Sequence, residues 1–185
     1  MCAPWWQPER LYRCNMHVVS TRCSRLTSWT RNLRNEKVRG SSPLSSSTQP
    51  LIELLAMDNT GDWTQHTIAK VSECPNRVIV LIDEATQRLR TFATYPKPAG
   101  TTNAGVCTSS GGAIYEKSTP LDTISFTTTK TARIVDADQY VHNVSSTKQN
   151  LNKPGSGTAN SSVMVIADVN ATSRYWYYYQ GASTA

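Results

Sequence analysis

The sequence lacks the patterns that mark several large classes of protein. No stretch reaches the run of about 18 apolar residues that predicts a membrane-spanning helix. Residues 1–20 contain neither an apolar core nor a small-residue cleavage site, so they do not predict a signal peptide. Cysteines at CxxC spacing are absent and the three histidines are isolated, so we expect neither a metal nor a cofactor. No long amphipathic helical pattern occurs either.

Charge is scarce and unevenly placed. Charged residues make up 17% of the chain, and the formal net charge is +6. Residues 1–40 hold seven arginines and one lysine against two glutamates, whereas the other 145 residues carry 11 basic and 11 acidic groups. The basic character therefore belongs to the N-terminal segment, and we expect no nucleic-acid partner for the balanced remainder. The basic segment itself has three interpretations: a disordered tail, a nucleic-acid-binding arm, and a mispredicted start of the protein.

Composition divides the chain into three parts. Residues 1–43 have no hydrophobic period and predict a disordered basic leader, residues 44–180 predict a folded body, and residues 181–185 predict a tail. Five cysteines cannot all pair with one another, and three of them lie in the leader. The two in the body, Cys74 and Cys107, are expected to be free thiols, the alternative being a disulfide in an exported protein.

Short strands bounded by turn residues fill the body. The first pair is predicted at 51–57 and 63–71, around the turn Asp58–Gly61, whose residue types tolerate positive φ or bond their own backbone. Four further strands are predicted at 77–82, 89–95, 113–117 and 132–135, and a last pair at 163–167 and 174–179.

The last pair of strands repeats the pattern of residues 77–95 at an offset of 85, so that Asp83 matches Asp168. Each aspartate is expected to bond the turn that follows it. Repeated units of short antiparallel strands are typical of β-propellers, whose blades have four strands. We therefore predict an all-β fold, a partial β-propeller of about two blades. Because propellers usually close with about 4–8 blades, we expect a C-terminal fragment completed by missing blades of the same protein.

A family resemblance is carried by residues 77–95, 112–126 and 145–151 and by the strand that ends at Tyr179. These stretches resemble secreted bacterial β-propeller proteins related to sialidases and five-bladed glycosidases. Ser118, Asp122 and Phe126 resemble a degenerate Asp-box, in which Ser and Asp bond the turn backbone and the aromatic ring packs into the blade. The resemblance implies a secreted, carbohydrate-associated protein and attaches no reaction to it.

Polar residues at the starts of predicted inner strands form the candidate ligand site. In a propeller these strand ends converge on the central channel, and a concave polar site suits a polyhydroxylated ligand. The candidates are Asn76, Arg77, Lys148, Gln149 and Asn150. We expect a non-catalytic or fragmentary carbohydrate-binding module. The alternatives are the C-terminal part of a glycoside hydrolase whose catalytic carboxylates lie in missing blades, and a leader that binds nucleic acid. No motif pairs two carboxylates, so no catalytic residue is predicted.

Two further predictions concern side-chain direction. Arg88 and Arg90 are expected to point outward. Alternation along Tyr175–Tyr179 places the three odd-numbered tyrosines on one face of a strand, and Trp176 and Tyr178 on the other. We expect both faces to pack between blades, the alternative being a platform on which sugar rings stack.

Overall fold

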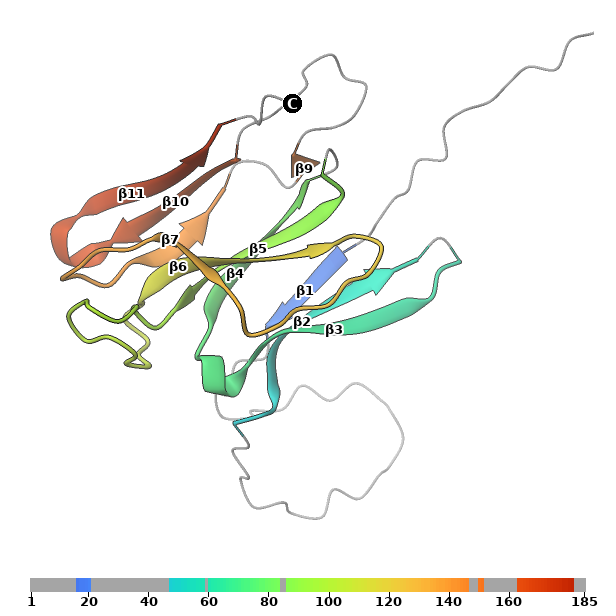
Figure 1. Cartoon of the computed structure of the whole chain (residues 1–185), viewed down its shortest axis with the longest axis horizontal. Coiled ribbons are helices and arrows are strands. Elements are labelled where there is room, and N and C mark those ends of the chain that lie inside the picture. The colour runs from blue at the N-terminus through green and yellow to red at the C-terminus, as the bar shows by residue number, and fades with distance from the viewer. Residues whose placement is uncertain are drawn as a thin grey trace, which may run out of the picture.

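The computed structural model describes residues 47–58, 60–83, 86–146 and 163–181, together with the backbone of 16–20 and 150–151. This part of the chain folds into three β-sheets with two short 3₁₀ helices and contains no α-helix (Figure 1). It also contains no helix long and apolar enough to cross a membrane. The prediction of an all-β fold is therefore confirmed.

The central sheet has five strands in the order β7-β6-β5-β4-β9. An antiparallel meander is formed by β4 (Asn76–Asp83), β5 (Arg88–Tyr95), β6 (Ala113–Pro120) and β7 (Thr131–Ile134). This confirms the predicted four-strand unit, whose β-branched and aromatic residues suit a pleated surface. The two-residue strand β9 (Asn150–Leu151), which was not predicted, pairs in parallel with the end of β4.

The first sheet has the order β1-β2-β3. The predicted hairpin consists of β2 (Pro50–Met57) and β3 (Trp63–Lys70). In its turn, Asp58 Oδ1 accepts hydrogen bonds from the backbone N–H groups two and four residues later, at 2.8 and 3.0 Å. Strand β1 (Met16–Ser20) pairs with β2 and lies inside the segment predicted to be a patternless leader. This strand was not predicted, because residues 16–20 show no alternation of apolar and polar side chains.

The third sheet has the order β8-β10-β11. Strands β10 (Val163–Val169) and β11 (Arg174–Gln180) form the predicted last hairpin. The 3₁₀ helix η2 (Asn170–Thr172) connects them, and Ser173 follows it with a left-handed φ of 53°. The third strand, β8 (His142–Ser145), was not predicted, and it pairs antiparallel with β10.

The three sheets are stacked, with the central sheet in the middle. On one face of β5, Tyr95 belongs to an apolar cluster that includes Leu54 of β2. On the other face, Phe92 belongs to a second cluster that includes Val165 of β10. All four side chains are at most 1% exposed. Successive side chains of a strand point to opposite faces, so two covering sheets bury β5 along nearly its whole length.

A buried ionic cluster links the central sheet to the third sheet. Glu116 Oε1 lies 2.5 Å from Arg90 Nε, and Glu116 Oε2 lies 2.8 Å from Arg133 Nε. Arg90 also donates to the side chain of Gln180 at 2.8 Å. Although burial disfavours its charged form, the hydrogen bond and the charge of Glu116 raise the pKa of Arg90. The predicted outward direction is wrong for Arg90, which is 6% exposed, because the third sheet covers this face.

A second ionic contact lies on the face toward the first sheet. Lys117 Nζ lies 2.6 Å from Glu73 Oε1 and donates to the carbonyl of Ile68 in β3 at 2.8 Å. Burial lowers the pKa of Lys117, and Glu73 opposes this effect. Burial, reinforced by the charge of Glu73, also raises the pKa of Tyr95. Both junctions of the stack therefore combine apolar packing with buried, paired charges.

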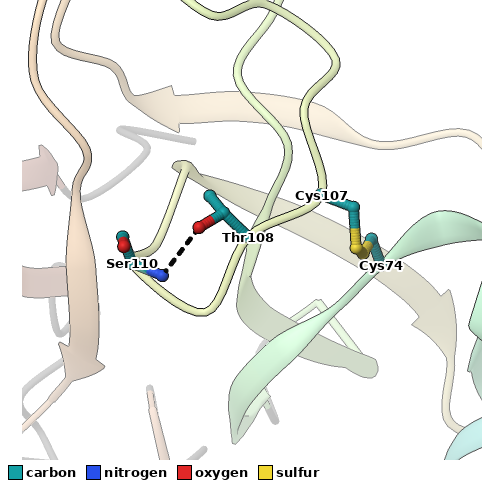
Figure 2. The surroundings of a disulfide bond; sticks show 4 residues. All are labelled: Cys74, Cys107, Thr108 and Ser110. Atoms are coloured by element: carbon teal, nitrogen blue, oxygen red, sulfur yellow. Dashed lines mark hydrogen bonds between the residues drawn. A yellow bond between two sulfur atoms is a disulfide. The ribbon is translucent and has the colours of Figure 1, made fainter.

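A disulfide joins Cys74 and Cys107, whose Cα atoms are 5.8 Å apart, a normal separation for a disulfide (Figure 2). Cys74 follows the 3₁₀ helix η1 (Val71–Glu73) with a left-handed φ of 54°. Cys107 lies in the loop between β5 and β6, where Thr108 Oγ1 accepts a hydrogen bond from the backbone N–H of Ser110 at 3.1 Å. The expectation of free thiols is wrong, because the fold brings two distant turns together.

The resemblance to an Asp-box is only partly reflected in the contacts. Ser118 Oγ is 2.6 Å from Arg88 Nε, and Asp122 Oδ1 accepts a hydrogen bond from the neighbouring threonine hydroxyl at 3.2 Å. The hydroxyl of Thr119 bonds the turn backbone instead, accepting from an N–H at 2.9 Å and donating to a carbonyl at 3.3 Å. Phe126 packs, half-buried, against the cluster between the first and central sheets.

Candidate functional site

The five predicted ligand-binding positions do not converge on one site. Asn76 begins β4 half-buried, and the exposed Arg77 follows it with a left-handed φ of 47°. Asn150 pairs with the far end of the same strand, six residues further on. At about 3.3 Å per residue, this separates Asn150 from Asn76 by about 20 Å. Lys148 and Gln149 lie outside the described residues.

A polar pocket of about 530 Å³ lies at the turn end of the β10–β11 hairpin. Strand β8, the last residues of β10, the turn and the start of β11 contribute to its wall. Apart from Val169, the lining consists of polar residues: Asn143, Asp168, Asn170, Ser173, Arg174 and Tyr175. None of these was predicted as a ligand-binding residue, and the pocket is the candidate site that the structure supplies.

Two acceptors in the pocket have no hydrogen-bond partner in the described part of the protein. Asn143 Oδ1 is buried and has no hydrogen-bond partner. Asn143 also has a left-handed φ of 45°, a conformation that asparagine tolerates better than most residues. Within the described residues, no group donates a side-chain or backbone hydrogen bond to the carboxylate of Asp168. Buried polar atoms are normally paired, so an unpaired acceptor beside a pocket favours a ligand that donates to it.

Arg174, which lines the pocket, is one of several groups that lower the pKa of Asp136, a carboxylate outside the lining. The pKa of Asp136 is lowered first by a hydrogen bond from the backbone N–H of Gln139 and then by that of Asp138. The charges of Lys97 and Arg174 lower it further. The lining of the pocket itself contains one cation, Arg174, and one carboxylate, Asp168. This balance of charge suits a neutral, hydroxyl-rich ligand better than an anion.

The two aspartates of the sequence repeat differ in position and contacts. Asp83 is directly opposite Arg88, whereas in the other hairpin Val169 is opposite Arg174, so Asp168 lies one residue earlier. Asp83 is 5% exposed, and its Oδ1 accepts the turn N–H three residues later at 3.3 Å. The predicted turn-stabilising role is therefore confirmed for Asp83. Asp168 is half-buried and lines the pocket instead.

The outer face of the third sheet carries a row of exposed tyrosines that begins at the pocket. Tyr175, Tyr177 and Tyr179 are 79%, 66% and 57% exposed, respectively. Tyr178 points to the other face, and its ring centroid lies 6.3 Å from that of Phe92. The predicted alternation is confirmed, but the expected packing between sheets is wrong for the three odd-numbered tyrosines, which nothing in the described structure covers. On the other face, Trp176 is also exposed.

The pocket contains groups that can bind a ligand and no evident catalytic pair. Asp168 is the one carboxylate of its lining. Glu116 and Glu73 are buried elsewhere and each is already paired with basic side chains. The part of the chain that the structure describes holds no group of three or more His, Cys, Asp or Glu side chains that could bind a metal ion.

Sequence reasoning missed the pocket because its residues come together only through strand pairing. Asn143 lies only five residues before Lys148 in the sequence, but it was not among the predicted candidates. Arg174 was predicted to begin the last strand, and no binding role was predicted for it or for Ser173. The signal that could have found them is the strand character of β8, since its pairing with β10 places Asn143 beside the turn.

The chain has no match among protein-family models, curated proteins or solved structures. The resemblance to sialidase-like propellers therefore stays a prediction from the stretches that carry it. The stacked sheets and the polar pocket are the observations on which a functional proposal can be based.

Proposed function

We propose that this chain is a non-catalytic, carbohydrate-binding module of a secreted β-propeller protein and that the polar pocket binds the glycan. The observation that supports this most strongly is the pocket itself. Polar side chains from three strands and a turn surround a space of about 530 Å³, and an exposed tyrosine ring lies at its edge. This volume falls in the range of small-molecule sites.

The chemistry of the pocket suits sugar hydroxyls, which both donate and accept hydrogen bonds. The acceptors are the carboxylate of Asp168 and the buried Oδ1 of Asn143, neither of which has a partner in the described protein. The donors are the guanidinium of Arg174 and the amide of Asn170. The ring of Tyr175 offers a flat apolar surface for the C–H face of a sugar.

The propeller assignment is supported by the order and stacking of the sheets. A four-stranded antiparallel meander is the structure of a blade, and the three sheets follow one another in chain order with their faces in contact. The parallel strand β9 departs from this pattern. Secretion is supported by the disulfide between Cys74 and Cys107, because disulfides persist mainly in oxidising compartments.

A glycoside hydrolase is the weaker candidate. Such enzymes place two carboxyl groups about 5–9.5 Å apart across the scissile bond. Asp168 is alone in the lining of the pocket, so an enzyme would need a second carboxylate from chain outside the described residues. The basic leader could bind nucleic acid only through residues that also lie largely outside the described part.

The experiment is isothermal titration calorimetry with neutral oligosaccharides first identified on a glycan array. Asp168→Asn removes the charged acceptor while keeping its shape, and we expect about tenfold weaker binding, since hydrogen bonds to charged groups contribute about 1.5–3 kcal/mol. The matched control is Asp122→Asn, which changes an exposed carboxylate in the β6–β7 connection. Loss of binding in both variants, or in neither, contradicts this location of the site, and a wild-type chain that binds no glycan contradicts the function.

A further inference from the structure

The candidate pocket adjoins one end of the tyrosine row on the outer face of the third sheet. Tyr175 belongs to both, because it lines the pocket and is the first of the three exposed tyrosines along β11. Tyr177 and Tyr179 follow at alternate positions, so they point to the same face of the sheet. At about 3.3 Å per residue, the row extends over about 13 Å, which exceeds the length of one pyranose ring. A ligand held in the pocket therefore contacts the whole row only if it is a chain of several sugar units.

The neighbouring strands continue the row as an uncharged surface. Directly opposite the three tyrosines, β10 places Asp168, Ile166 and Met164. Asp168 lies at the pocket end, and Met164 at the other end is exposed. On the far side of β10, the exposed Ser145 of β8 lies opposite Ile166. Among the described residues that the strand register places on this face, Asp168 alone is charged. The face therefore suits a neutral ligand, as the pocket does.

The shape of the row favours a linear ligand. β11 is the edge strand of the third sheet, and within the described residues no strand pairs with its outer edge. The three rings therefore lie in single file along one strand, with one ring at every second residue. A β-1,4-linked glycan is an extended ribbon whose flat faces carry C–H groups, so successive sugar units can contact successive rings. An α-1,4-linked chain coils and cannot follow a straight row.

We propose that the pocket and the tyrosine row together bind one extended, uncharged, β-1,4-linked glycan chain. One end of the chain occupies the pocket, and the following sugar units lie on Tyr177 and Tyr179. This inference rests on the proposed function of the pocket, and it adds the class of glycan and two binding residues outside the pocket. Tyrosine offers a large, rigid contact at low conformational-entropy cost, so the row contributes to affinity without enclosing the ligand.

The pocket and the row should contribute to binding in different ways. Asp168 accepts hydrogen bonds from the sugar in the pocket, so its loss should weaken the binding of ligands of every length. Tyr177 and Tyr179 contact only the units beyond the pocket, so their loss should weaken the binding of long ligands alone. This difference distinguishes an extended site from a pocket that binds a short sugar beside an unrelated apolar face.

The test is isothermal titration calorimetry of the full chain with β-1,4-linked oligomers of glucose, mannose and N-acetylglucosamine, from the disaccharide to the hexasaccharide. In the series that binds, we expect the hexasaccharide to bind about tenfold more tightly than the disaccharide. This estimate takes each added aromatic contact as about two- to tenfold in affinity. The α-1,4-linked glucose oligomers of the same lengths are the matched control ligands, and their affinity should not rise with length.

Single substitutions then assign the gain in affinity to the row. Tyr177→Ala should weaken hexasaccharide binding about two- to tenfold and leave disaccharide binding unchanged. Tyr177→Phe keeps the ring and should bind as the wild type does. The matched control is Trp176→Ala, which removes an exposed aromatic ring of the same strand from the opposite face and should change neither affinity. Asp168→Asn should weaken the binding of both ligands by the same factor.

The outcomes separate this inference from the proposed function. If a disaccharide binds but affinity does not rise with length, the inference is overturned while the pocket remains a glycan site. The same holds if Tyr177→Ala weakens no ligand, or if Trp176→Ala weakens the hexasaccharide as much as Tyr177→Ala does. A wild-type chain that binds no glycan, on the array or in these series, overturns the proposed function and this inference together.

Discussion

The hairpins β4–β5 and β10–β11 are built alike, but they differ in what covers them. Each has two antiparallel strands of seven or eight residues joined by a short turn. The central hairpin lies between two sheets, and Phe92 in its second strand is fully buried. The last hairpin is covered on one face, and Tyr177 in its second strand is 66% exposed. The difference shows that an aromatic residue in a strand predicts a face that can pack, and that only the neighbouring sheet decides whether it does.

Removing the ring of Phe92 and removing that of Tyr177 should change the free energy of unfolding by very different amounts. Phe92→Ala leaves a cavity between the central and third sheets and should lower the free energy of unfolding by about 3–5 kcal/mol. Tyr177→Ala should change it by no more than about 0.5 kcal/mol in dilute solution, where the outer face is open. Urea unfolding of both variants at one low protein concentration measures the difference. An equal cost would mean that the tyrosine face is buried within a single chain.

The disulfide is expected to stabilise the central hairpin without contributing to the last one. It encloses a segment with a sequence separation of 33 residues, for which chain entropy predicts about 3–4 kcal/mol of stabilisation. Replacing both Cys74 and Cys107 by Ser should therefore lower the unfolding free energy by that amount. Replacing the three leader cysteines serves as the control and should leave it unchanged. A double Ser variant as stable as the wild type would contradict the pairing.

The buried ion pairs should make the covered face sensitive to single charge changes. Glu116→Gln removes the carboxylate that pairs with Arg90 and Arg133, and it leaves at least one buried guanidinium without a counter-charge. We expect a loss of about 3 kcal/mol, the lower end for breaking a buried pair. Asp122→Asn, on an exposed turn, should have no measurable effect on the same unfolding curve. A Glu116→Gln variant with an unchanged free energy of unfolding would indicate that the third sheet does not exclude water from this face.

Much of the fold could be predicted because the strands carry their own signals. The hairpin of β2 and β3, the meander from β4 to β7 and the last hairpin were all found from alternation and turn residues. Strands β1, β8 and β9 were missed, since they are short or polar and are ordered by the strand beside them. The β-propensity of such strands is weak, so pairing with a neighbouring strand decides whether they form.

The candidate site could not be predicted from local patterns. Asn143 and Arg174 are far apart in sequence and meet only because β8 pairs with β10. The repeat at an offset of 85 matches Asp168 with Asp83, but Asp83 is opposite Arg88, whereas Asp168 lies one residue before the position opposite Arg174. Arg90 was expected to point outward, because the sheet that covers its face is formed by strands near the C-terminal end of the chain.

The smallest expected effect is a pH dependence of stability that originates at Asp136. The pKa of Asp136 is lowered by backbone N–H groups and by Lys97 and Arg174, so its ionised form stabilises the folded state. This contribution is complete above the unfolded pKa of 3.8 and is lost as the pH falls through the lower folded value. The difference in melting temperature between wild type and Asp136→Asn should therefore be constant near neutral pH and shrink in this acidic window. A difference that grows on acidification contradicts the assignment.

Hydroxyl-radical footprinting with mass spectrometry tests the central claim most directly, because it reports on the covered and the open aromatic face in one sample. Phe92 should be protected from oxidation at every protein concentration. Tyr177 should be oxidised readily, because its face of the third sheet is open. A Tyr177 as strongly protected as Phe92 would contradict the account.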